Sequence, residues 1–376
     1  MTNNEELVRM FLAEGAVHLY SSDPIILTTA DLRYASVRPE LRDLVSGCNI
    51  YLIACRPRLL IEQGTCFREG MLCGRFLVLR KNGWARVPFE MALPNDVDAL
   101  IENIEVYTAA SGTHVMLETR DEAKRRYLMP VHRIIASANA DLADEERDLN
   151  VLYIGQAIGH KKSRSAVDRL RRHETLQAIL ADYHTYHPER EILLLLYRFE
   201  NQRVLISTGG DLRLKPVASE AQERMHLRKM SGAYLNRKEC ISLAEAALIN
   251  YFKPVYNKIF KKTNFSRASR IKTLRSALRE ELVGVIVEIC TVNAGARLIS
   301  EDCAPGHNDI LDSMEVGMRE RLEEGIDAQL YQDVCSEVRR MKHTHYARFA
   351  LTTIQERETF LHGTVWLDSD ERMPFL

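Results

Sequence analysis

Residues 150–157 read Asn-Val-Leu-Tyr-Ile-Gly-Gln-Ala (NVLYIGQA), a short apolar run that carries one tyrosine and one glycine. Short apolar runs bounded by polar segments are typical of buried strands. The run MPVHRIIA at 129–136 predicts a second strand, and an acidic loop joins the two runs. Together they predict a pair of strands in the middle of the chain.

Three further elements follow in the order helix, strand, helix. They are a basic helix-forming stretch at 164–183 (RSAVDRLRRHETLQAILADY), a buried strand at 191–199 (EILLLLYRF) and a helix at 241–252 (ISLAEAALINYF). The order β-β-α-β-α predicts a small antiparallel sheet with helices packed against it. We expect this central domain to span residues 126–262.

The segments on both sides predict mixed structure, so the expected fold class is α+β. Residues 1–125 open with a helical pattern at 5–16 and continue with strand patterns, among them NIYLIAC at 49–55. Residues 263–376 begin with a basic helix and then alternate strand and helix patterns. We expect an N-terminal α+β domain and a C-terminal domain of mixed strands and helices. Either could serve a protein partner or self-association.

The composition, with 46% hydrophobic and 27% charged residues, is typical of a soluble globular protein. No apolar run reaches the roughly 20 residues that span a bilayer, and the first residues lack the layout of a signal peptide. We therefore expect a cytoplasmic protein without membrane contact, whose eight cysteines are reduced thiols. Four cysteines fall between residues 48 and 73. Their spacing is too wide for a structural zinc module, so packing within strands is the favoured interpretation.

Charge is segregated along the chain although the formal net charge is only −1. Residues 246–279 contain nine basic side chains and no acidic one. A basic block of this length is typical of a surface that contacts phosphate backbones, although such blocks also serve solubility. The block therefore favours nucleic acid as a partner.

Three side chains of the central domain carry functional groups that can bind a phosphate ester or a metal ion beside it. Arg169 and His173 are four residues apart, which predicts one face of a helix that offers a guanidinium and an imidazole together. Glu245 lies in an otherwise apolar helix, where a carboxylate needs a cation beside it. That cation could be a structural lysine or arginine, or a metal that prefers oxygen ligands, Mg²⁺ or Mn²⁺.

The order of these pieces resembles the GIY-YIG nuclease superfamily over residues 129–257, although the intervals between them are longer than in minimal members of that family. Tyr153, Ile154 and Gly155 resemble the YIG element, and Arg169 with His173 resembles the arginine helix of the family. Glu245 matches the metal-binding carboxylate, and Asn257 the asparagine that closes the motif. The resemblance implies metal-dependent hydrolysis of phosphodiester bonds. Residues expected to contact nucleic acid are Lys161, Lys162, Asn257, Lys258, Lys261, Lys262, Arg267 and Arg270.

The first strand departs from the family pattern. Where GIY is expected, the run at 129–136 has Pro130, Val131 and His132. The general base is therefore open between His132, which can accept a proton near neutral pH, and Tyr153, which needs nearby cations to do so. We expect His132, Tyr153, Arg169, His173 and Glu245 to converge on one site.

The leading prediction is a metal-dependent endonuclease, with DNA preferred over RNA by family frequency. Genome defence or restriction, including defence against viruses, fits such a protein, and a repair or mobile-element role stays open. The alternative is a nucleic-acid-binding or sensing protein whose nuclease fold is inactive because of His132. A third hypothesis is an RNA-cleaving toxin.

Overall fold

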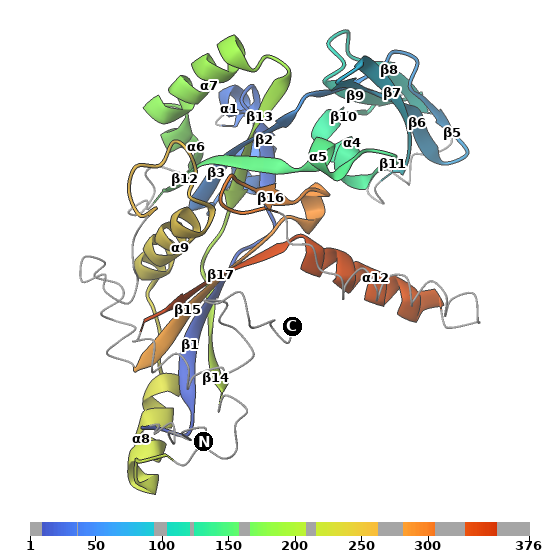
Figure 1. Ribbon diagram of the computed structural model, residues 1–376. Coiled ribbons are helices and arrows are strands. Elements are labelled where there is room, and N and C mark those ends of the chain that lie inside the picture. The colour runs from blue at the N-terminus through green and yellow to red at the C-terminus, as the bar shows by residue number, and fades with distance from the viewer. Residues whose placement is uncertain are drawn as a thin grey trace, which may run out of the picture.

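The computed structural model describes residues 10–35, 37–93, 104–120, 124–157, 166–207, 216–261, 281–304 and 328–351. The protein is mixed α+β, and the strands within these ranges form four small sheets (Figure 1). None of the helices in these ranges is long and apolar enough to cross a membrane.

A five-stranded sheet occupies the middle of the molecule. Its strands, in spatial order, are β16 (Leu298–Ile299), β12 (Leu149–Gln156), β3 (Ile50–Pro57), β13 (Arg190–Tyr197) and β2 (Ile25–Thr28). In β3, Ile50 and Leu52 point to one hydrophobic core, whereas Tyr51 and Ile53 point to another. Because side chains alternate along a strand, a sheet with both faces buried reads as the near-continuous apolar runs seen in the sequence.

One face of this central sheet packs on helix α9 (Arg237–Phe252), which also contacts a second sheet. The second sheet has the strand order β14 (Asn201–Ser207), β1 (Glu14–Tyr20), β15 (Leu282–Cys290) and β17 (Thr344–Ala350). Helix α9 begins at a capping box formed by Asn236 and Glu239 and ends at Lys253 in the left-handed conformation. Its apolar residues are buried nearly all round, as expected for a helix between two sheets (Figure 1).

Four short or medium helices cover the other face of the central sheet. They are α1 (Asp31–Tyr34), α2 (Pro39–Leu44), α6 (Ala166–Leu170) and α7 (Glu174–Tyr186). The break between α6 and α7 falls at His173, which caps the N-terminus of α7. The stretch predicted as one helix at 164–183 is therefore two helices in the part that the structure describes.

Residues between β3 and β12 form a module with its own core, in the upper right of Figure 1. One sheet of the module contains β4 (Leu59–Ile61), β5 (Cys66–Arg68), β6 (Met71–Arg80), β7 (Gly83–Ala92) and β11 (Asn139–Ala140). The other contains β8 (Ile104–Thr108), β9 (His114–Thr119) and β10 (Arg126–Pro130), and the helices are α4 (Val131–Ser137) and α5 (Asp144–Arg147). All eight cysteines are free, which agrees with the expected thiols.

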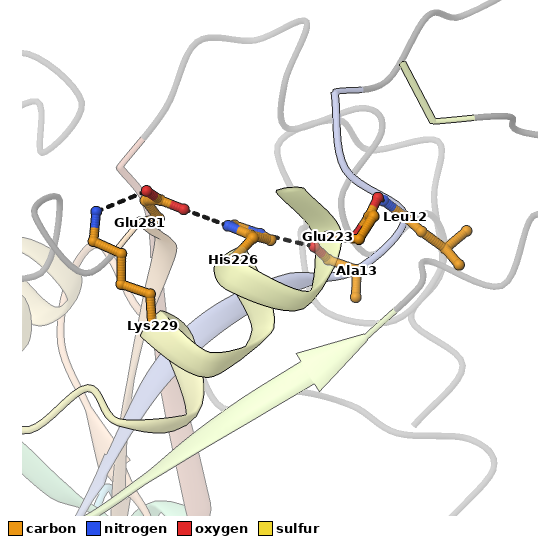
Figure 2. Close-up of polar contacts among 6 residues, drawn as sticks. All are labelled: Leu12, Ala13, Glu223, His226, Lys229 and Glu281. Carbon is orange, nitrogen blue, oxygen red and sulfur yellow. Dashed lines mark hydrogen bonds and ion pairs between the residues drawn. The ribbon is translucent and has the colours of Figure 1, made fainter. Parts of the chain in front are cut away.

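Helix α8 (Glu220–Ser231) fastens two strands of the second sheet at the same end (Figure 2). The buried His226 lies 3.0 Å from the carbonyl oxygen of Ala13, just before β1, and 2.5 Å from the carboxylate of Glu281, just before β15. Lys229 donates a hydrogen bond of 2.7 Å to the same carboxylate. The remaining elements are the single-turn η3 (Val292–Ala294) and α12 (Ala328–Lys342).

Two local predictions are wrong. The run at 129–136 is not a strand: β10 ends at Pro130, and α4 follows. Its apolar residues Val131, Ile134 and Ile135 are spaced for one buried helical face, and the short run was ambiguous between the two periods. The helical pattern at 5–16 also fails at its end, because β1 begins at Glu14.

The pairing of strands crosses the boundaries expected at 125 and 262. Strand β3 pairs with β12 and β13, and β1 pairs with β14 and β15. The neighbour of the NVLYIGQA strand is therefore the run NIYLIAC, which lies in the segment expected to form a separate N-terminal domain.

Candidate active site

Two tyrosines from neighbouring strands lie beside each other in the central sheet. Tyr51 of β3 is fully buried and Tyr153 of β12 is half-buried, and their ring centroids are 6.3 Å apart. Gly155 is paired directly with Tyr51, and a Cβ atom at Gly155 would lie 2.5 Å from the Tyr51 hydroxyl. The glycine therefore allows the Tyr51 ring to lie across β12.

His173 packs against both rings from the start of α7. Its ring centroid lies 5.7 Å from that of Tyr51 and 4.9 Å from that of Tyr153. The backbone N–H of Leu176 donates to His173 Nδ1, so a neutral ring carries its proton on Nε2. Burial, and then the charge of Arg169, lower the pKa of His173, which favours the neutral form.

Arg169 is the cation of the group, exposed near the end of α6. Its charge lowers the pKa of Tyr51, Tyr153, His173 and Glu245, so it lies within electrostatic reach of all four. Because His173 begins the next helix, the expectation that both side chains project from one helical face is wrong. The two side chains are nevertheless near each other, since the charge of Arg169 acts on His173.

Glu245 reaches the same group from α9, on the other side of the sheet. Its carboxylate accepts a hydrogen bond from the backbone N–H of Gln156, the last residue of β12. Burial raises the pKa of Glu245 to about 7, and Arg169 and the Gln156 N–H only partly oppose this. The ionised carboxylate is therefore only partly stabilised by Arg169 and the Gln156 N–H against the cost of its burial. We call these five residues, Tyr51, Tyr153, Arg169, His173 and Glu245, the Tyr51 cluster.

The Tyr51 hydroxyl is buried and makes no hydrogen bond of ordinary geometry in the described ranges. Arg169 and Tyr153 lie close enough for weaker side-chain hydrogen bonds with it, which affect the pKa values of both tyrosines. Burial first, and Tyr153 second, raise that pKa, so the hydroxyl keeps its proton at neutral pH. A buried polar group without a well-formed hydrogen bond costs free energy, which is typical of an atom that awaits a ligand.

His132 does not belong to the cluster, which corrects the sequence prediction. It is buried in the first turn of α4, and burial followed by the charge of Arg56 lowers its pKa to about 4. Arg56 and Tyr51 are five residues apart on β3, a separation of roughly 16 Å along an extended strand. His132 is therefore beside the far end of β3, among core residues of the inserted module.

Asn257 is also not a surface residue, contrary to the prediction that it contacts nucleic acid. It is buried, its side-chain oxygen accepts from the backbone N–H of Ile154, and its amide donates to the carbonyl of Ile154, both at 2.9 Å. It thus supports the edge of β12 between Tyr153 and Gly155. Of the predicted lysines, Lys258 is exposed and Lys261 donates to the carbonyl of Val255. Lys161, Lys162, Lys262, Arg267 and Arg270 lie outside the described residues.

The cluster offers a metal ion one carboxylate. Within the described ranges, no three or more His, Cys, Asp or Glu side chains are gathered as a metal site. A single oxygen ligand with the remaining positions left to water suits Mg²⁺, which gives up its waters reluctantly. The uncompensated charge of Glu245 fits such an ion.

Tyr51 is the site residue that the sequence analysis missed. The local signal was the run Asn49-Ile50-Tyr51, which was assigned to a strand but to another domain. Only the pairing of β3 with β12 brings it beside Tyr153. No protein-family model, curated protein or solved structure matches the chain. Function is therefore argued from this geometry.

Proposed function

We propose that the protein is a metal-dependent endonuclease that hydrolyses phosphodiester bonds in nucleic acid at the Tyr51 cluster. The observation that carries this proposal is the partly buried Glu245 carboxylate, with a pKa of about 7, in one group with Arg169 and three rings. Phosphodiesters have very high uncatalysed barriers, so fixed cations and a metal are the natural catalysts.

We propose further that the central sheet with α6, α7 and α9 forms a nuclease domain of the GIY-YIG type. In this interpretation the first strand of the motif is β3, and Asn49-Ile50-Tyr51 takes the part of GIY with a change only at its first residue. The YIG element remains Tyr153-Ile154-Gly155 on the neighbouring strand. A tyrosine then fills the position for which His132 had been considered.

Each side chain has a role that follows from its surroundings. Arg169 stabilises charge on the phosphate, since it is exposed and acts on the whole cluster. One of the two tyrosines, Tyr51 or Tyr153, would accept the proton of the attacking water as a phenolate, and the hydroxyl of the other would orient that water. His173, neutral and protonated at Nε2, donates a hydrogen bond to the phosphate or to the leaving oxygen.

A divalent cation, Mg²⁺ or Mn²⁺, would be held by Glu245. When bound, it supplies positive charge that lowers the pKa of nearby hydroxyl groups and offsets charge on the phosphate. This explains why two tyrosines whose pKa values are raised in the protein alone can take part in proton transfer. It also explains why the carboxylate has no cationic side chain in contact within the described ranges.

DNA is the proposed substrate, with a role in genome defence as the proposed context, and Lys258 is an exposed residue available to contact its backbone. The alternative of an inactive, nucleic-acid-binding protein rested on His132 as a replacement for the catalytic tyrosine. With Tyr51 in the cluster, that ground is lost. Cleavage of RNA, the activity of the hypothetical toxin, is tested by repeating the assay with an RNA substrate.

The direct test is plasmid cleavage in Mg²⁺ or Mn²⁺ by the parent protein and the Glu245→Ala variant. We expect the variant to lose cleavage by about a hundredfold or more, and EDTA to abolish cleavage by the parent. Glu220→Ala is the matched control, since Glu220 is exposed on α8 and pairs only with Arg224. Equal cleavage by Glu245→Ala and the parent would end the proposal.

A further inference from the structure

Helix α9 packs against one face of the second sheet. On the opposite face the central residues Ala16, His18 and Ile286 are buried, whereas Arg203 and Tyr346 on the two edge strands are exposed. Val17 and Leu19 of β1 point to the core shared with α9, so His18 and Tyr20 point to the opposite face. Residues of neighbouring strands continue the row. We call this surface, made of His18, Tyr20, Arg203, Glu288, Tyr346 and Arg348, the His18 face.

A chain of polar contacts fixes an exposed arginine on this face. Arg203 of β14 donates from Nε to His18 Nδ1 at 2.8 Å, and His18 Nε2 lies 2.9 Å from the carboxylate of Glu288. Because Nδ1 accepts, Nε2 carries the ring proton and faces the carboxylate. His18 is only 2% exposed, so the contact is shielded from water. The guanidinium is thus held by its Nε edge while the residue itself stays exposed.

Aromatic rings flank the fixed guanidinium. Arg203 lies over the ring of Tyr20 at 5.5 Å, and the ring of His18 is 5.7 Å from that of Tyr20 and 6.4 Å from that of Tyr346. Tyr346, on the edge strand β17, is 37% exposed. The face therefore presents rings from β1 and from β17, which lie on either side of β15, rather than a uniform polar surface.

The charge of the face is positive. Arg203 and the exposed Arg340 of α12 lie near one carboxylate, Glu288, whose side chain is 12% exposed and already contacts His18, and Arg348 lies over the ring of Tyr346. The charges of Arg340 and Arg203 both act on that carboxylate. A ligand of this face therefore has to be an anion with flat groups.

We propose that the His18 face binds single-stranded nucleic acid, apart from the Tyr51 cluster. Unpaired bases stack on Tyr346 and Tyr20, and a phosphate lies on the outer edge of the Arg203 guanidinium. A sheet with aromatic rings and arginines is suited to single strands because their bases are free to stack, whereas the bases of a duplex are already stacked on one another. The Glu288–His18 contact serves to fix Arg203 in the orientation that a phosphate needs.

The test is equilibrium binding by the full chain in EDTA, so that cleavage plays no part. Fluorescence anisotropy is measured with labelled oligothymidine, oligouridine and a duplex of equal length. We expect both single strands to bind more tightly than the duplex, and Arg203→Gln and Tyr346→Leu each to weaken single-strand binding about tenfold. Arg203→Gln should also reduce the slope of log affinity against log salt by about 0.7.

Two further variants separate this site from general positive charge. Arg203→Lys keeps the charge but not the planar guanidinium, so it should weaken binding almost as much as Arg203→Gln. Tyr346→Phe keeps the ring and should bind like the parent. The matched controls are Arg224→Gln and Tyr234→Leu, both exposed and away from this face. Thermal unfolding checks that each variant is folded.

Unchanged single-strand affinity in folded Arg203→Gln and Tyr346→Leu proteins would overturn the proposal, as would parent-like binding by Arg203→Lys. So would equal affinity of the parent for the duplex and the single strands. Because binding is measured without cleavage, a protein that binds here and cuts nothing would refute the nuclease proposal alone. A protein that cuts but shows no effect of these variants would refute the binding surface alone.

Discussion

The Tyr51 cluster and the His18 face are built from the same types of side chain, but the pKa of the glutamate is shifted in opposite directions in the two. Each combines one glutamate, one histidine and two tyrosines with arginine, which is Arg169 alone in the Tyr51 cluster and Arg203 with Arg348 on the His18 face. On the His18 face, the contact with His18 lowers the pKa of Glu288. In the Tyr51 cluster, burial raises the pKa of Glu245 to about 7, and Arg169 acts only from a distance.

The two glutamates differ in what their carboxylates contact, and not in the types of residue around them. Glu288 is 2.9 Å from a ring nitrogen, whereas Glu245 has only a backbone N–H of Gln156 as a recorded hydrogen-bond donor in the described ranges. Glu288 thus has a partner at ion-pair distance, although His18 Nε2 makes no hydrogen bond of ordinary geometry in the described ranges. A buried carboxylate without a cation in contact is costly, and proteins retain such groups chiefly at functional sites.

The largest expected effect is on cleavage, from removing one hydroxyl in each group. Tyr51→Phe should lower the cleavage rate by about a hundredfold, since it removes from the reaction a buried hydroxyl that lies beside Arg169 and Tyr153. Tyr346→Phe, the same change on the His18 face, should leave the rate close to that of the parent. Initial rates on plasmid DNA measure both.

His132→Ala completes that comparison, because His132 is beside Arg56 and not in the cluster. We expect it to cut at close to the parent rate after correction for the folded fraction. A larger loss for His132→Ala than for Tyr51→Phe would show that the assignment to β3 is mistaken.

The next effect is on stability and has opposite signs at the two glutamates. In metal-free buffer at pH 8, Glu245→Gln should raise the free energy of unfolding, because it removes a costly buried charge. A pKa displaced from 4.5 to about 7 corresponds to at most about 3 kcal/mol. Glu288→Gln should lower stability, by roughly 1–3 kcal/mol, because His18 loses its partner. Thermal or denaturant unfolding measures both.

The sign is checked by repeating the measurement at lower pH. For Glu245, whose pKa is raised on folding, the favourable contribution is present below about pH 4.5 and is lost as pH rises through about 7. The gain in Glu245→Gln should therefore shrink as pH falls from 8 to 5. For Glu288, whose pKa is lowered, the contribution is lost as the solution becomes acidic. Destabilisation by Glu245→Gln at pH 8 would identify a structural ion pair instead.

The smallest effect on stability concerns His173. His173 accepts a backbone N–H as the cap of α7, so His173→Ala should cost about 1 kcal/mol of stability. His173→Asn replaces one good cap with another and should restore most of that loss. Neither variant has the Nε2–H group, so cleavage should fall about tenfold or more in both. Recovery of cleavage in His173→Asn would reduce His173 to a purely structural role.

Much of the fold could be predicted from local patterns. The runs at 150–157 and 191–199 are strands, and the helix at 241–252 was found from its apolar length. The approach failed at 129–136, where Val131, Ile134 and Ile135 fit a short strand or a helical face equally well. The tertiary setting, packing into the core of the module, decided for the helix.

The site was only partly predictable for a reason of topology. Tyr153, Arg169, His173 and Glu245 each lie in a distinctive local context, and the structure brings these four together. Tyr51 has no distinctive local context, because a single tyrosine in an apolar strand is common. Sequence reasoning pairs strands that are neighbours along the chain, and here a whole module separates β3 from β12.

That module has a mechanical consequence. Residues 58–148 leave the central sheet after β3 and return at β12, where Cys55 and Asn150 are already paired, so a short turn could have joined the same ends. The module is thus attached by two antiparallel strands of one sheet, a much stiffer tether than a single flexible linker. A molecule bound by the module would therefore be held at a fixed distance from Tyr51 and Tyr153, and the two strands would set that distance.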